Sequence, residues 1–95
     1  MSVEFEWNPA KARSNVRKHG VSFELAQRAF GDPFLVAFPD PLHSAEEERF
    51  LMIGAAARGT ILVCSYTERD PSIRIIMARR ATSREVKYSE QTWQR

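Results

Sequence analysis

The chain has little cysteine and no long apolar run. Its 95 residues include one cysteine, Cys64, so no disulfide can form within the chain. No stretch approaches the roughly 18 apolar residues of a membrane span. The N-terminus also lacks the charged and apolar regions of a signal peptide. These absences predict a cytoplasmic protein that makes no use of a membrane.

Motifs of several enzyme classes are missing as well. His19 and His43 have no acids or cysteines at metal-ligand spacing, so the sequence predicts no metal site and no cofactor. It contains no glycine-rich phosphate loop and no G-x-S-x-G nucleophile motif. Cys64 lies in an apolar run, which favours packing over nucleophilic catalysis.

The overall composition is that of an ordinary globular domain. Hydrophobic residues make up 43% of the chain and charged residues 27%. We expect residues 1–95 to form one domain, since two domains would each be too small for a core. A core of this size is modest, so a partner chain could complete some of the apolar surface.

The net charge is only +2, but the charges are unevenly distributed. Residues 11–28 hold five basic groups and one acid, and residues 69–95 hold seven basic groups and three acids. Between them, residues 32–48 hold five acids and no Lys or Arg. If the two basic segments meet in the fold, they would form a surface that attracts phosphate.

The first third of the chain predicts a strand followed by two helices. Apolar and acidic residues alternate in VEFEWN (3–8), as in a short half-buried strand. Asn8 is expected to cap a helix over 9–19, which Gly20 ends. A second helix is predicted over 23–30.

The remaining two thirds predict four strands and a final helix. The strands are expected at 34–38, 49–56, 60–68 and 73–79. Thr82 and Glu85 have the spacing of a capping box that begins the helix. The predicted fold class is α+β with the order β-α-α-β-β-β-β-α, a twisted antiparallel sheet and helices packed on one face.

The last strand carries arginines among apolar residues. Alternation assigns three side chains to the core: Ile73, Ile75 and Met77. It places Arg74 and Arg80 together on the opposite face. A guanidinium suits this position if the face binds phosphate, because it donates paired hydrogen bonds and keeps its charge. The alternative is a half-exposed strand residue, with Arg74 paired to Glu68. Both interpretations stay open on the sequence alone.

Three further residues are candidates for proton transfer. Glu68 and Tyr66 share one side of the preceding strand, so they are expected near Arg74 across the hairpin. Glu68 would act as a general base or as a strut that orients the guanidinium, and a close arginine would weaken it as a base. Lys18 and His19 end the first predicted helix, where they either complement the helix dipole or, in the case of His19, shuttle protons.

Five segments occur together in a recognisable order: FEWNPAKARSNVRKHGVSFELA, FGDPF, EERFLMIG, YTERDPSIRIIMARRAT and RE. They resemble the BrnT family of toxins over residues 5 to about 88. The resemblance implies a RelE-like α+β fold and a ribonuclease toxin of a bacterial type II toxin–antitoxin module. It further implies a BrnA antitoxin with a ribbon-helix-helix DNA-binding domain. A 2:2 complex that contacts operator DNA through the antitoxin is the corresponding expectation.

Matching these motifs gives a set of expected site residues. For metal-independent RNA cleavage through the 2′-hydroxyl, Arg74 and Arg80 would stabilise the transition state, while Glu68, Lys18 or His19 would move protons. Further RNA contacts are expected from Arg79, Arg69, Arg49, Arg84 and Lys87. Tyr66 stands where relatives often have a histidine. The alternative function is a basic module that binds nucleic acid or a partner without catalysis.

Overall fold

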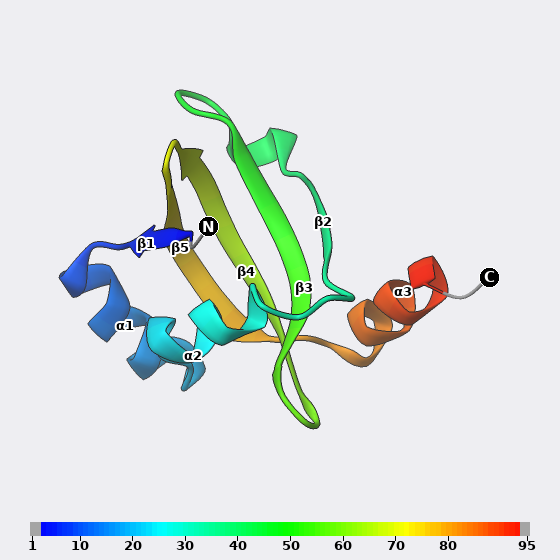
Figure 1. Ribbon diagram of the computed structural model, residues 1–95. Helices are drawn as coiled ribbons and strands as arrows, with labels where there is room; N and C mark the ends of the chain where they lie inside the picture. Colours follow the sequence, from blue (N-terminus) through cyan, green and yellow to red (C-terminus); the bar gives the residue numbers. More distant parts are fainter. Residues whose placement is uncertain (1–2, 94–95) are drawn as a thin grey trace.

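The structure is a computed structural model that describes residues 3–93 (Figure 1). Within them, five strands form one sheet in the order β1-β5-β4-β3-β2. The strands are β1 (Glu4–Glu6), β2 (Val36–Pro39), β3 (Arg49–Ala57), β4 (Thr60–Arg69) and β5 (Ser72–Arg80). The helices are α1 (Pro9–His19), α2 (Phe23–Ala29), the short 3-10 helix η1 (Pro41–His43) and α3 (Ser83–Trp93). The α+β class and the predicted order of strands and α-helices are confirmed.

Local sequence signals account for the bounds of α1. The Asn8 side chain accepts hydrogen bonds from the backbone N–H groups of Ala10 at 2.8 Å and Lys11 at 3.1 Å. Gly20 ends the helix at a φ of 69°, a conformation that favours glycine. The helix therefore spans the predicted residues 9–19.

The sheet is mixed rather than wholly antiparallel. The β2–β3, β3–β4 and β4–β5 pairs are antiparallel, as predicted for a meander. By contrast, β1 pairs in parallel with β5, with Glu4 opposite Ser72 and Glu6 opposite Arg74. Along the chain, α1, α2 and the other strands lie between β1 and β5, so no tight turn joins these two strands. They can therefore pair in parallel.

The helices cover both faces of the sheet. On one face α1 and α2 enclose the core, which contains Phe23, Met52, Cys64 and Ile75 among its buried side chains. The prediction that all helices pack on one face is wrong for α3. Its Tyr88 ring lies 6.0 Å from that of Phe38, which is paired with Leu51 on the face opposite Met52.

A β-bulge in β5 changes which side chains face the core. Tyr66 pairs with Ile75 but Ser65 pairs with Met77, so Ile76 is an extra residue in β5. An extra residue reverses the alternation beyond it. Ala78 is therefore fully buried beneath the helices, and Met77 lies on the other face. The prediction that Met77 shares the core side with Ile73 and Ile75 is wrong for this reason.

The Asn15 side chain closes the open edge of β5. Because β1 pairs only with the first three residues of β5, the later residues have no neighbouring strand on that side. The buried Asn15 amide donates to the carbonyl oxygens of Ala78 at 2.7 Å and Val21 at 2.9 Å. Its oxygen accepts from the Ala78 N–H at 3.1 Å. One side chain thus pairs with β5 as a strand would and fixes α1 beside it.

Replacing this amide should destabilise the whole domain. Asn15→Ala leaves three buried backbone groups without partners, so we expect the free energy of unfolding to fall by about 2 to 4 kcal/mol. Urea denaturation measures the change. The neighbouring Ser14→Ala is the control and should shift stability by no more than about 0.5 kcal/mol. A loss for Asn15→Ala no larger than that of the control would contradict the role of the amide.

Candidate nucleic-acid interface

Arg74 belongs to a polar row that crosses four strands on the face away from α1 and α2. The sheet register places Arg49 opposite Thr67, Thr67 opposite Arg74, and Arg74 opposite Glu6. The Arg74 Nη1 donates to Glu6 Oε2 at 2.7 Å. The Thr67 hydroxyl donates to the carbonyl oxygen of Glu48 at 2.7 Å. Two guanidinium-bearing residues therefore flank a threonine on one sheet face.

The expected pairing of Arg74 with Glu68 is wrong. Glu68 lies opposite Ile73, one residue out of step with Arg74, so the two side chains extend from opposite faces of the sheet. Glu68 does share its side with Tyr66, as predicted. Burial and the negative charge of Glu68 together raise the pKa of Tyr66. The carboxylate partner of Arg74 is Glu6 of β1. The sequence does not identify Glu6 as a site residue.

A small basic hollow lies between α1 and the edge of β5. It has a volume of about 160 Å³ and is lined by Lys11, Ser14, Asn15, Lys18, His19, Ile76 and Met77. Ile76 follows Arg74 by two residues, a distance of roughly 6 to 7 Å along a strand. The hollow therefore lies at the edge of the sheet near Arg74 in the strand, while the Arg74 side chain extends on the face away from α1. We call Lys11, Lys18, His19, Arg49 and Arg74 together the basic face.

Lys11 is a member of the basic face that the sequence interpretation missed. It precedes Lys18 by seven residues, two helical turns, which places both on one side of α1. That spacing is visible in the sequence and could have identified it. Asn15, between them, gave no comparable signal, because its partner Ala78 is 63 residues away.

Arg79 and Arg80 are placed differently from Arg74. Both terminal nitrogens of Arg79 donate to Glu85, each at 2.8 Å. The hydrogen bond from Arg79 is the main cause that lowers the pKa of Glu85 to about 2. Arg80 is exposed and lies opposite Leu62, on the face that α1 and α2 cover. The prediction that Arg74 and Arg80 share a face is therefore wrong, because the bulge at Ile76 separates them.

Glu85 also forms the predicted capping box of α3. Its Oε1 accepts from the Thr82 N–H at 2.8 Å, and the Thr82 hydroxyl oxygen accepts from the Glu85 N–H at 3.2 Å. Together with the Arg79 ion pair, these bonds hold the start of α3 to the end of β5. The structure thus gives Arg79 a role in anchoring the helix.

The other arginines and lysines expected to bind RNA lie at the margins. Arg84 and Lys87 are exposed on α3, beyond the end of β5. Arg69 lies 3.3 Å from a carboxylate oxygen of Glu47 and 3.8 Å from one of Glu6. The Arg69 guanidinium is therefore already paired with acidic side chains.

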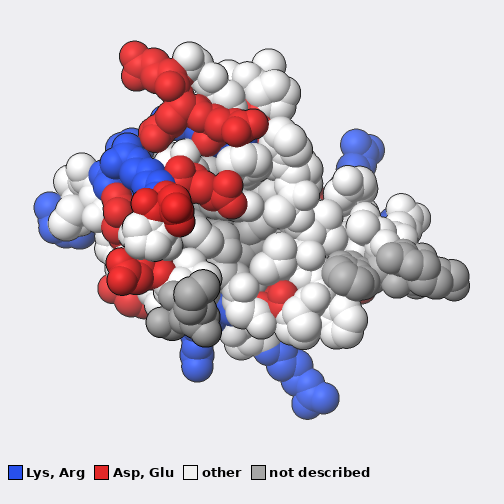
Figure 2. All heavy atoms as spheres, turned by 45° about the horizontal axis from the view of Figure 1, so that its top comes forward, with Lys and Arg blue, Asp and Glu red and all other residues white. Residues whose placement is uncertain are grey.

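Acidic side chains gather where β1, residues 46–48 and the β4–β5 turn meet. Figure 2 shows them grouped on one side of the molecule around a few basic groups. We call this the acidic end and define it as Glu4, Glu6, Glu46, Glu47, Glu48, Glu68 and Asp70. Such a group of carboxylates repels phosphate, so the acidic end limits how far an RNA could extend from the basic face.

Residues 3–93 show neither a cluster of metal ligands nor a reactive thiol. No three His, Cys, Asp or Glu side chains among them come together as a metal site would require. Cys64 is fully buried, and burial raises the pKa of its thiol to about 12. It packs as predicted and is not available as a thiolate. No helix in this part of the chain has the length and apolar character needed to cross a membrane.

Comparison with known families identifies the family of the chain. A family model described as the ribonuclease toxin BrnT of type II toxin–antitoxin systems matches residues 7–85. The chain belongs to the BrnT family. This membership confirms the resemblance seen in the sequence and makes the chain a ribonuclease toxin of the type II toxin–antitoxin class.

A solved structure shows that the fold is that of BrnT as well. The crystal structure of the Brucella abortus ribonuclease toxin BrnT superposes with a TM-score of 0.68 and 20% sequence identity. The match covers 86% of this chain and 100% of that one. No curated protein sequence matches the chain. At 20% identity the structural match shows the fold alone. Membership of the BrnT family is shown by the family model.

The anchor of α3 should depend on pH through Glu85. Its folded-state pKa of about 2 is below the ordinary value of 4.5. The stabilisation is therefore present above about pH 4.5 and is lost as the pH falls toward 2. Glu85→Gln should lower the free energy of unfolding by about 1 to 2 kcal/mol at pH 7.

Urea denaturation of wild type and Glu85→Gln at a series of pH values tests this anchor. The difference between the two proteins should shrink as the pH falls below 4.5. Glu90→Gln, an exposed change on the same helix, should show no such trend. A constant difference at all pH values would show that the carboxylate is not the stabilising group.

Proposed function

We propose that this BrnT-family toxin is an endoribonuclease that binds RNA on its basic face and cleaves it without a metal ion. In this reaction the RNA 2′-hydroxyl loses its proton to a base and attacks the adjacent phosphorus, and the bond to the 5′-oxygen of the next nucleotide breaks. The leaving 5′-oxygen takes up a proton, and the other fragment ends in a 2′,3′-cyclic phosphate. The observation that carries the proposal is that the row of Arg49 and Arg74 on one sheet face lies close to the basic hollow that the end of α1 forms at the edge of β5.

Arg74 is the best placed residue to stabilise the transition state. Glu6 accepts from its Nη1, so the guanidinium has further N–H groups for a phosphate. The ion pair also orients the side chain, whose exposed fraction is 29%. A partly buried, fixed cation stabilises developing charge better than a mobile one in water. Arg49, on the same row, would contribute a second charge.

Proton transfer is best assigned to the last turn of α1. His19 is exposed at the basic hollow, and an imidazole can both accept and donate a proton. Lys18, beside it, would hold the phosphate. Glu68 and Arg80 belong neither to the arginine row nor to the lining of the basic hollow, so we assign them no step in the reaction. Arg84 and Lys87 would make outer contacts with RNA.

The family implies an antitoxin as the partner of this chain. We propose that it is of the BrnA type, with a ribbon-helix-helix domain through which a 2:2 complex contacts operator DNA. We also propose that the toxin acts in the cytoplasm, where its RNA substrate is found, and that it inhibits translation. A RelE-like relationship is in keeping with the helices and sheet described above.

Cleavage by an arginine variant tests the proposal. Arg74→Ala removes the charge that would stabilise the transition state, so the cleavage rate should fall roughly 100- to 1000-fold. The measurement is single-turnover cleavage of an RNA oligonucleotide in EDTA, with the fragment ends identified. We expect a 2′,3′-cyclic phosphate, the product of attack by the 2′-hydroxyl.

Arg58→Ala is the matched control, because it removes an exposed arginine from the β3–β4 turn. It should cleave within about threefold of wild type, as expected for a residue outside the site. Equal rates for the two variants would overturn the role of Arg74. Loss of all cleavage in EDTA would contradict the metal-free route. Intact RNA that is still bound would support the non-catalytic alternative.

A further inference from the structure

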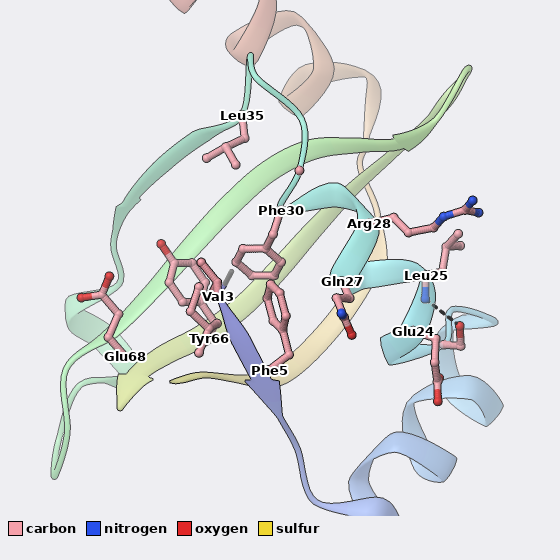
Figure 3. Close-up of a pocket in the computed structure, with 13 residues that line it drawn as sticks. Val3, Phe5, Glu24, Leu25, Gln27, Arg28, Phe30, Leu35, Tyr66 and Glu68 are labelled. Carbon is pink, nitrogen blue, oxygen red and sulfur yellow. Dashed lines mark hydrogen bonds between the residues drawn. The ribbon is translucent and has the colours of Figure 1, made fainter. Parts of the chain in front are cut away.

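A large hollow of the described chain lies on the face opposite the arginine row. It is a groove of about 970 Å³ between β1, α2 and β4 (Figure 3). Its centre is formed by the rings of Phe5, Phe30 and Tyr66, with centroids 5.2 Å apart for Phe5–Phe30 and 5.1 Å for Phe30–Tyr66. Val3, Leu25, Leu35 and Ile73 complete the apolar lining.

The groove is open to solvent and has no part in the proposed RNA cleavage. Phe5 and Phe30 are only partly buried, and Val3 is 54% exposed. Apolar surface of this kind on a small domain commonly marks a protein interface. Aromatic side chains are also the residues that contribute most to such interfaces.

The charges at the rim indicate what kind of partner would fit. Glu68 and Glu24 line the groove on opposite sides of the three rings. Among the described residues that line it, Arg28 is the one cation, and Figure 3 shows it extending away from the rings. Glu68 continues into the acidic end, which adds further carboxylates on that side. Phosphate would be repelled here, whereas Lys or Arg side chains would be attracted.

We propose that this groove anchors the antitoxin. The occupant is a segment of the antitoxin whose apolar side chains rest on Phe5, Phe30 and Tyr66. Basic side chains flank them and pair with Glu68 and Glu24. This inference rests on the toxin–antitoxin assignment within the proposed function, but not on the residues that cleave RNA.

One strand connects the groove to the basic face. Phe5 of β1 lines the groove, while the next residue, Glu6, holds Arg74 on the other face of the sheet. A partner in the groove therefore contacts the strand that orients Arg74. The remainder of the antitoxin can pass around β1 and reach the basic face.

A pair of matched double variants tests the anchor. Val3→Lys with Glu24→Lys places positive charge on an exposed apolar residue and an exposed acid of the groove. Leu42→Lys with Glu90→Lys makes the same two kinds of change outside it, so the net charge changes equally. Binding of the purified antitoxin encoded with this chain is measured by calorimetry, without RNA. The groove variant should raise the Kd at least about tenfold and the control no more than about threefold.

A second measurement uses the unaltered chain. Amide hydrogen exchange should slow in β1, α2 and the Tyr66 segment when antitoxin binds, and high salt should weaken the binding. Equal Kd values for the two double variants, or protection confined to the basic face, would overturn the proposal. Self-association of the chain alone that the groove variant abolishes would do so too, since the occupant would be a second copy.

The readouts keep this inference separate from the proposed reaction. RNA cleavage should be retained in both double variants, since neither alters the basic face. If the protein binds antitoxin through the groove but cleaves no RNA, the reaction is wrong and the anchor stands. If it cleaves RNA but both variants bind antitoxin like wild type, the anchor is wrong and the reaction stands.

Discussion

The buried Asn15 amide forms two hydrogen bonds with the backbone of Ala78, and these hold α1 against the open edge of β5. The position of Lys18 and His19 depends on them. Because β1 is too short to cover this edge, Ala78 would otherwise expose an unpaired N–H and C=O. The amide supplies both partners and so fixes the helix along the strand. Lys18 and His19 then lie at Ile76, two residues from Arg74. A single buried polar side chain thus satisfies the edge of β5 at Ala78 and fixes the end of α1 beside it.

The two faces of the sheet have different chemistry. One carries Arg49 and Arg74, with the basic hollow of α1 at the nearby edge of β5, and suits a phosphate backbone. On the other, aromatic rings between carboxylates suit an apolar, basic protein segment. Glu6 and Phe5, neighbours in β1, connect the two faces. Substrate and partner can thus be recognised by separate surfaces of one small domain, with β1 shared between them.

Much of the fold could be predicted because its signals are local. The capping residues Asn8 and Gly20 define α1, and the T-x-x-E box defines the start of α3. The site was harder to predict, because the face on which each side chain lies depends on the register of the strands. Ile75 and Ile76 are equally suited to a strand, so nothing in the sequence marks the bulge that sends Arg80 to the other face. The offset of one residue that separates Glu68 from Arg74 is equally hidden, since it depends on how the β4–β5 turn sets the pairing.

The most direct test of the central claim is to map where RNA binds. A 2′-O-methyl RNA oligonucleotide cannot supply the attacking hydroxyl, so it can be titrated into isotope-labelled protein without cleavage. We expect the largest changes in amide chemical shift at Lys18, His19, Arg49 and Arg74, and we expect salt to reduce them. Changes confined to the groove around Phe30, Tyr66 and Glu68 would contradict the assignment of the basic face as the RNA-binding surface.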